Sequence, residues 1–147
     1  MRYYCETNLF VLLLVSLRAT ISASAVNDQS YIFYNGAFSL SPSDPTHCYY
    51  RNVTKIENSA GIRVTGSVSV LKGVADLFIM TTPQMTIFRS MGARTCEAFR
   101  PDAAFSAYNL QSNNTISFVL PNDGRYYFLL FNPSNLEVTG RLTLTLD

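Results

Sequence analysis

The sequence predicts an all-β protein, an antiparallel β-sandwich of about eight strands in a single domain. Short apolar segments with a period of two recur through residues 31–146, and this alternation is typical of strands with one buried face. Turn residues (Gly, Pro, Asn and Asp) separate these segments at nearly regular spacing, as they do in sandwiches. One short stretch, residues 83–90, is expected to be helical instead.

The stretch Thr115–Phe131 is expected to form the centre of the sandwich as a hairpin. In its first half Ile116, Phe118 and Leu120 alternate with Ser117 and Val119, so one face is apolar, and Pro121–Gly124 supplies a turn. The returning half is apolar on both sides, and such a strand belongs in the middle of a sheet that is covered above and below.

The other elements follow from the same pattern. Asn35-Gly36 is a strong hairpin signal and should join two short strands at 31–34 and 37–40. Lys72-Gly73 is expected to turn the chain between two further strands. After Thr82-Pro83, Gln84–Ser90 should form one or two helical turns, with a strand through residues 85–88 as the alternative. The remaining strands are expected at residues 48–53, 62–70, 74–80, 104–110 and 136–146.

The first 25 residues have the pattern of a cleaved secretory signal peptide. Arg2 precedes the apolar run Leu9–Leu17, and Ala23-Ser24-Ala25 fits a cleavage site. The apolar run is too short to cross about 30 Å of hydrocarbon as a helix. We therefore expect a single domain at 26–147, secreted or in the lumen of the secretory pathway, without a stable membrane span.

The charge balance gives no reason to expect nucleic acid or an anionic membrane as a partner. The whole chain has 11 basic and 10 acidic residues, and loss of Arg2, Arg18 and Glu6 leaves nine of each. Because no run of like charge occurs either, the surface offers no electrostatic attraction for a polyanion.

The cysteines and two glycosylation sequons agree with secretion. Once Cys5 leaves with the signal peptide, Cys48 and Cys96 are the only possible intrachain pair. Their disulfide would close a loop of about 50 residues and contribute roughly 4 kcal/mol in chain entropy; two unpaired buried thiols are the alternative. Asn52 and Asn113 begin the acceptor sequons and should lie on the surface.

Two blocks of the sequence resemble GOLD domains, the lumenal β-sandwiches of the emp24/p24 cargo receptors. Cys48-Tyr49-Tyr50 with residues 64–70 and 75–79 is similar to the early part of these domains. Residues 118–132 are similar to their late hairpin, and also to bacterial pre-peptidase C-terminal domains. The resemblance implies a sandwich that makes protein contacts without catalysis.

The chain also departs from this family in several ways. The family's second cysteine lies in the late strand, where this chain has Leu129 and Leu130. The coiled coil, membrane helix and cytoplasmic tail of the cargo receptors have no counterpart. A trafficking role is therefore the alternative and not the first choice.

Few residues carry a signal for catalysis. His47, the only histidine, follows Asp44 by three residues and could act in a small hydrolase, but no nucleophile elbow accompanies it. A loop histidine is the favoured interpretation. The carboxylates that could pair for acid–base chemistry are Asp76, Glu97, Asp102 and Asp123.

Asp76 is the most informative of these carboxylates. It lies in an otherwise apolar strand, where it needs a partner such as an arginine, or an edge position; a pKa-shifted catalytic group is the less favoured alternative. The turn Asn122–Gly124 has too few oxygen ligands to bind calcium. With one histidine and a cysteine pair expected in a disulfide, the sequence also lacks the ligands for a zinc site. We expect no metal, no cofactor and no enzymatic activity.

The tyrosines are the candidate ligand surface. Tyr31, Tyr34, Tyr49 and Tyr50, with Tyr108, could form a platform for a protein or glycan, because tyrosine combines contact area with a hydroxyl group. The sequence thus predicts a secreted, disulfide-bonded, non-catalytic glycoprotein that acts through surface contact.

Overall fold

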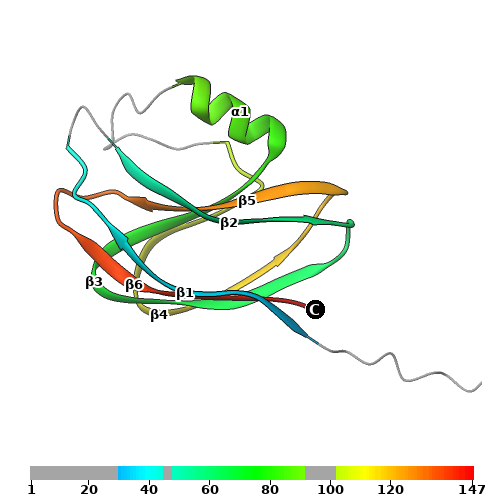
Figure 1. Cartoon of the computed structure of the whole chain (residues 1–147), viewed down its shortest axis with the longest axis horizontal. Helices are drawn as coiled ribbons and strands as arrows, with labels where there is room; N and C mark the ends of the chain where they lie inside the picture. The colour runs from blue at the N-terminus through cyan, green and yellow to red at the C-terminus, as the bar shows by residue number, and fades with distance from the viewer. Residues whose placement is uncertain (1–29, 45–47, 92–101) are drawn as a thin grey trace, which may run out of the picture.

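The computed structural model describes residues 30–44, 48–91 and 102–147 (Figure 1). The signal peptide prediction lies outside the described residues. The described elements are, in chain order, β1 (Tyr31–Leu40), β2 (Tyr49–Asn58), β3 (Arg63–Thr81), α1 (Thr82–Met91), β4 (Phe105–Val119), β5 (Gly124–Asn132) and β6 (Val138–Leu146). All strand pairs are antiparallel, so the predicted all-β class with one short helix is confirmed.

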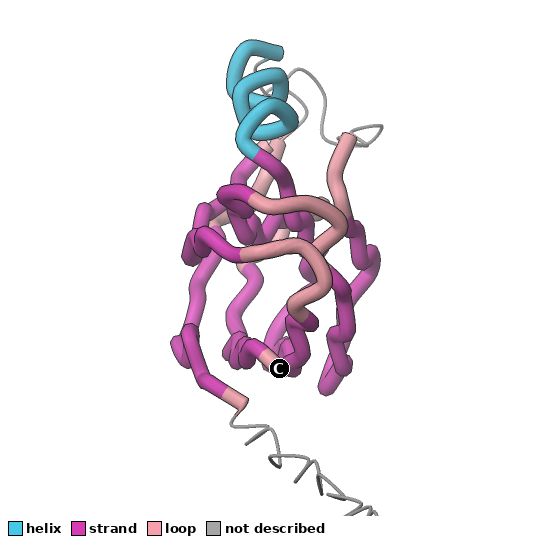
Figure 2. Tube along the Cα trace, turned by 90° about the vertical axis from the view of Figure 1, so that its right-hand side faces the viewer, coloured by secondary structure: helices cyan, strands magenta, loops and turns pink. Residues whose placement is uncertain are grey.

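The six strands form one sheet that folds over itself into two layers (Figures 1 and 2). The first half of β3, Val64–Lys72, pairs with β6, and its second half, Asp76–Thr81, pairs with β5. Beyond β6 lies β1, and beyond β5 lies β2. We call these two halves of the sheet the β6 layer and the β5 layer. β4 follows β3 from one layer into the other, since it pairs with both halves.

Residues with left-handed backbone conformation mark the bend between the layers. Gly73 has φ +81°, and Asn109 and Ser112 have φ 55° and 57°. The register between β3 and β4 shifts in the same region, between Val70 and Ala75. Glycine adopts such a φ without steric cost, so the Lys72-Gly73 signal marks a bend within one strand and not a turn between two.

The strands are fewer and longer than predicted because three expected breaks lie inside continuous strands. They are Asn35-Gly36 in β1, Lys72-Gly73 in β3 and residues 111–114 in β4. The Asn35-Gly36 hairpin is wrong: β1 runs straight through it, with Asn35 opposite Thr143 and Gly36 opposite Leu142. Asn35 Oδ1 accepts hydrogen bonds from Arg141 Nε at 2.9 Å and Thr143 Oγ1 at 3.3 Å. Pairing with β6 therefore outweighs the local turn preference.

The predicted central hairpin is also wrong as a hairpin. β4 and β5 are not paired with each other; β4 pairs with β3, and β5 lies between β2 and β3. The chain crosses between layers at Leu120, whose N–H donates to Ile62 O at 2.9 Å and whose carbonyl accepts from Gly61 N–H at 2.8 Å. The expected central position of the second half is confirmed, because β5 is buried on both faces.

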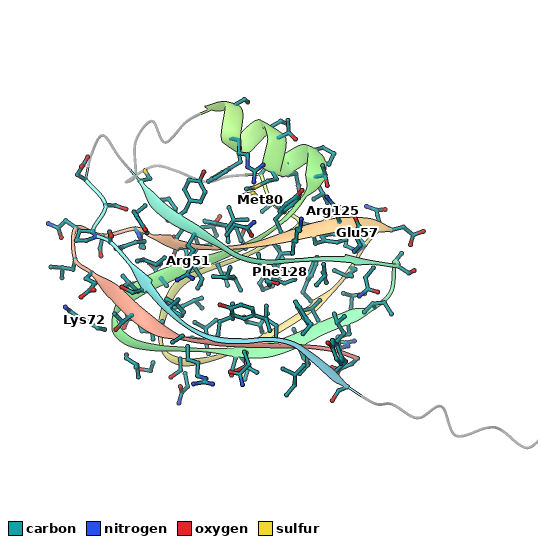
Figure 3. The ribbon with its side chains drawn as sticks, in the orientation of Figure 1. Arg51, Glu57, Lys72, Met80, Arg125 and Phe128 are labelled. Atoms are coloured by element: carbon teal, nitrogen blue, oxygen red, sulfur yellow. The ribbon has the colours of Figure 1, made fainter. Side chains whose placement is uncertain are left out.

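Two apolar clusters account for these positions. The main core fills the space between the layers, where Phe128 of β5 is fully buried (Figure 3). A smaller cluster lies on the outer side of the β5 layer, beneath α1, and includes Met80. The β5 layer is therefore covered on both faces, whereas the outward face of the β6 layer has no covering element among the described residues.

Candidate functional site

Helix α1 begins directly at the end of β3, where the Gln84 side chain caps its first turn. Gln84 Oε1 accepts hydrogen bonds from Thr81 N–H and Thr81 Oγ1, both at 3.0 Å. This Thr-x-x-Gln arrangement is half of a capping box, and it satisfies a backbone donor at the helix start. The predicted helix is confirmed, with the cap one residue before the expected Thr82; the alternative strand through 85–88 is wrong.

The helix lies over the β5 layer through two apolar side chains. Met85 and Phe88 are buried in the smaller cluster with Phe78, Met80, Leu129 and Phe131. On β2, Tyr50 packs edge-on against the Phe88 ring, with centroids 4.8 Å apart, and 36% of Tyr50 remains exposed. An aromatic side chain is thus held at the boundary between α1 and solvent.

A polar cluster surrounds Tyr127 on the same side of the β5 layer. Lys55 of β2 lies opposite Tyr127 in the strand register, and the Arg89 guanidinium of α1 lies over the Tyr127 ring, 5.8 Å from its centroid. Arg125 forms a salt bridge with Glu57 on β2, and the two side chains are labelled beside α1 in Figure 3. We call the surface formed by Tyr50, Lys55, Arg89, Arg125 and Tyr127 the α1 face.

Electrostatics couple Arg125 and Tyr127. A hydrogen bond with Tyr127 is the largest cause that raises the pKa of the Arg125 guanidinium. The hydrogen bond with Glu57 and the negative charge of Glu57 raise it further. The same bond with Arg125 lowers the pKa of the Tyr127 phenol; a bond with Thr82 and the charge of Lys55 act in the same direction, against burial. Arg125 and Thr82 thereby fix the position of the Tyr127 hydroxyl.

A small cleft of about 190 Å³ opens at the end of this face, lined by Thr81, Thr82, Pro83, Asp123, Gly124, Arg125 and Tyr126. Its polar groups have structural partners. Asp123 Oδ1 accepts from Ala60 N–H at 2.6 Å, which ties the loop before β5 to the loop after β2. Tyr126 Oη donates to Asn122 O at 2.7 Å. These groups hold the ends of strands together.

The four predicted tyrosines do not share one surface. Tyr31 begins β1 and is 66% exposed, whereas Tyr34 is half-buried against the main core. Tyr49 and Tyr50 are consecutive in β2 and point to opposite sides. β1 is ten residues long, which places Tyr31 about 30 Å along the strand from Leu40. Of the four, Tyr50 is the one on the α1 face, and a ligand role for each stays a prediction.

Tyr108 of β4 contacts the smaller apolar cluster. It packs edge-on against Phe78, with centroids 5.6 Å apart, and is 37% exposed.

The candidate catalytic residues are dispersed or lie outside the described residues. His47 and Glu97 are in the second group. Asp76 is buried in β3, and its Oδ1 accepts from Asn109 N–H at 2.7 Å. The predicted edge position is wrong, because β3 has β4 and β5 on its two sides. Asp102 is exposed at the start of the segment that leads to β4.

Two further properties concern the described residues alone. Within residues 30–44, 48–91 and 102–147, His, Cys, Asp and Glu form no group of three that could hold a metal ion. In the same ranges, no helix has both the length and the apolar character needed to cross a membrane.

The residues expected from secretion are partly described. The sulfur of Cys48 is in a disulfide, and Cys96 lies outside the described residues, so their pairing stays a prediction. Asn52 and Asn113 are both exposed. Asn52 lies opposite Leu129 on β2, and Asn113 lies opposite Ser69 at the rim of the β6 layer. Occupancy of both sequons stays a prediction.

The outward face of the β6 layer differs from the α1 face in composition and bonding. Small hydroxyl and amide side chains cover it in cross-strand rows, such as Thr145 beside Thr65 and Thr143 beside Ser67. Many bond to one another: the Thr65 and Thr145 hydroxyls are 2.6 Å apart. Asn35 likewise accepts hydrogen bonds from Arg141 and Thr143 across the β1–β6 pair.

Sequence reasoning missed the residues around Tyr127. Lys55, Arg89 and Arg125 are isolated cations in the sequence, and only the pairing of β2 with β5 and the position of α1 bring them together. One signal was available: Arg89 follows Phe88 in the amphipathic stretch 84–90, where an apolar side chain faces the sheet and its neighbour lies at the rim.

No family model and no characterised protein sequence matches the chain. Among solved structures, the chain is similar to one from a study of Bacillus endospore appendages, described as disulfide-linked pili. Identity is 11% over 82% of this chain and 89% of that chain, with a TM-score of 0.44. It is also similar to PliG of Aeromonas hydrophila, a periplasmic inhibitor of g-type lysozyme, with 14% identity over 80% and 86% of the two chains and a TM-score of 0.40. These are similarities of backbone arrangement, and they assign no partner or activity to this chain.

Proposed function

We propose that this protein is a secreted or lumenal, non-catalytic binding module that contacts a protein partner through the α1 face. The observation that carries the proposal is the composition of that face. Tyr50, Tyr127, Arg89 and Arg125 gather there around a helix, and tyrosine and arginine are enriched at the centres of protein interfaces. Secretion is supported by the signal-like residues 1–25 and by Asn113, an exposed sequon asparagine outside the α1 face.

The rigidity of the face supports the same proposal. The Tyr50 ring rests on Phe88, and Tyr127 is held by Arg125, Thr82 and the overlying Arg89. Side chains that are already ordered lose less conformational entropy on binding. In contrast, the outward face of the β6 layer carries rows of small hydroxyl side chains, some of which bond to one another.

The non-catalytic assignment is supported by the roles of three described carboxylates. Asp76 accepts a backbone hydrogen bond in the interior, Asp123 joins two loops, and Glu57 pairs with Arg125. Each has a structural function.

Partner capture with matched variants tests the proposal. The full chain, secreted from eukaryotic cells with a tag, would be compared with Tyr50→Ala and with Tyr31→Ala, which removes an exposed tyrosine away from the α1 face. The proposal expects the same partners on wild type and Tyr31→Ala and their loss from Tyr50→Ala, with secretion unchanged. Equal capture by all three proteins, or loss from the Tyr31 variant alone, would contradict it.

A further inference from the structure

The α1 face carries more positive than negative charge. Lys55, Arg89 and Arg125 approach Tyr127 from β2, α1 and β5, and Glu57 is the acidic residue beside them. Glu57 is engaged by Arg125. Among the described residues, neither Lys55 nor Arg89 has an ion-pair partner, and both are exposed.

The chain as a whole is close to neutral, with a formal net charge of +1. Two cations without an ion-pair partner among the described residues, Lys55 and Arg89, are therefore a property of this face and not of the general composition. Complementary charge at an interface favours encounter with the correct partner and disfavours others.

The hydroxyl group at the centre of the cluster adds a directed contact. Tyr127 is half-buried between two guanidinium groups, so its phenol lies where an acidic side chain attracted by Lys55 and Arg89 would arrive. A carboxylate can accept hydrogen bonds from an ammonium, a guanidinium and a phenol at once. Tyr50 provides an apolar surface on the same face.

From this arrangement we propose that the α1 face recognises an acidic segment of a protein partner, with Lys55, Arg89 and Tyr127 binding a carboxylate and Tyr50 contacting an adjacent apolar side chain. This inference rests on the proposed function and specifies the chemistry of its partner. A sulfated glycan would also be attracted by the cations, but the aromatic side chain favours a segment in which acidic and apolar residues alternate.

Fluorescence anisotropy with defined probes tests the inference. The probes are a labelled peptide of alternating glutamate and phenylalanine, the same peptide with glutamine in place of glutamate, and a heparin oligosaccharide. We expect the glutamate peptide to bind the full secreted chain and the glutamine peptide to bind at least about tenfold more weakly. Lys55→Gln with Arg89→Gln should weaken glutamate-peptide binding by about tenfold or more.

The control variant is Arg63→Gln with Arg141→Gln, which removes the same charge from the β6 layer and should change Kd by less than about twofold. Tyr127→Phe keeps the ring beneath Arg89 and should cause an intermediate loss. Circular dichroism and the melting temperature would verify that each variant is folded.

Three results would overturn the inference: no binding of the glutamate peptide, equal weakening by the control variant, or binding of heparin alone through Lys55 and Arg89. If Tyr50→Ala still loses its captured partners while the peptide fails, the proposed function stands and only the acidic chemistry falls. If both experiments fail, the α1 face is not a binding surface.

Discussion

A single buried side chain, Asn132, joins the loops at one end of the molecule. Its Nδ2 donates to Ser41 O at 2.8 Å and to Leu136 O at 2.7 Å, and its Oδ1 accepts from Ser134 N–H at 2.9 Å. Its own carbonyl accepts from Ser43 Oγ at 2.7 Å. Sequence pattern did not reveal this role, because Ser41 and Ser43 lie 91 and 89 positions away from Asn132 along the chain.

Asn132→Ala should therefore destabilise the fold by more than about 2 kcal/mol, because it leaves buried carbonyl and amide groups without partners. Asn132→Asp should be no milder, since a carboxylate cannot donate to the two carbonyls. Urea denaturation gives the free energies of unfolding. Asn135→Ala, an exposed change in the same turn, is the control and should stay within about 0.5 kcal/mol of wild type; an equally mild Asn132→Ala would contradict this account.

Tyr127 should ionise at lower pH than an ordinary tyrosine, because Arg125 donates a hydrogen bond that favours the phenolate. An ultraviolet titration should show an early component that is absent in Tyr127→Phe and shifted to higher pH in Arg125→Ala. The ionised form contributes stability at pH values above the unfolded pKa, and that contribution is lost as the pH falls through the lowered folded pKa. A wild-type titration without this early component would exclude the interaction.

At the scale of the elements, close approach of β3 and β6 depends on glycine. A Cβ atom on Gly66 would lie 2.1 Å from the backbone oxygen of Thr143, so the strands pair here only because residue 66 has no side chain. On Gly36 of β1, a Cβ atom would meet the hydroxyl end of the Tyr34 ring at 2.8 Å. A backbone atom held in a sheet cannot move aside as the end of a side chain can.

Gly66→Ala should therefore destabilise the protein by roughly 1–3 kcal/mol or more through overpacking, and Gly36→Ala should cost clearly less. Thermal unfolding of the two variants, followed by circular dichroism, compares an identical chemical change at two positions of one layer. A larger loss for Gly36→Ala would contradict the packing described here.

β1 and β2, the two end strands of the order β1-β6-β3-β5-β2, are protected from edge-to-edge pairing. Both have a register shift, between Ile32 and Tyr34 in β1 and between Asn52 and Thr54 in β2. The extra residues, Phe33 and Val53, pack against the main core. Bulged edges resist the addition of another strand, which favours contact through a face of the molecule over contact through an edge.

Local pattern predicted the class of each element but not its length or partner. The apolar runs in β3 and β5 and the alternation in β6 follow directly from burial, and they were predicted. The sequence alone could not show that the predicted Asn35-Gly36 turn is wrong, because only the pairing with Thr143 and Leu142 shows that β1 continues through these residues. The α1 face was not predictable for the same reason: its cations come from three elements.

At the scale of the whole molecule, β3 and β4 pass through both layers, so neither layer is an independent sheet. The predicted Cys48–Cys96 disulfide would add one covalent link beside the smaller apolar cluster, where Cys48 is buried. The GOLD-like identity stays a prediction alongside it.

Peptide mapping of the secreted chain without reduction should give one cross-linked pair of fragments that contain Cys48 and Cys96. Reduction, or a double Ala variant, should lower the free energy of unfolding by about 2–5 kcal/mol. Recovery of Cys96 as a free thiol would contradict the predicted pairing.

Hydrogen–deuterium exchange of the secreted chain, alone and with its captured partner, shows whether the partner contacts the α1 face. We expect slower exchange on binding in α1 and in the parts of β2 and β5 that carry Tyr50, Lys55 and Tyr127. The strands β1 and β6 should remain unchanged. Protection confined to the β6 layer, with none at α1, would contradict the claim that this protein acts through the α1 face.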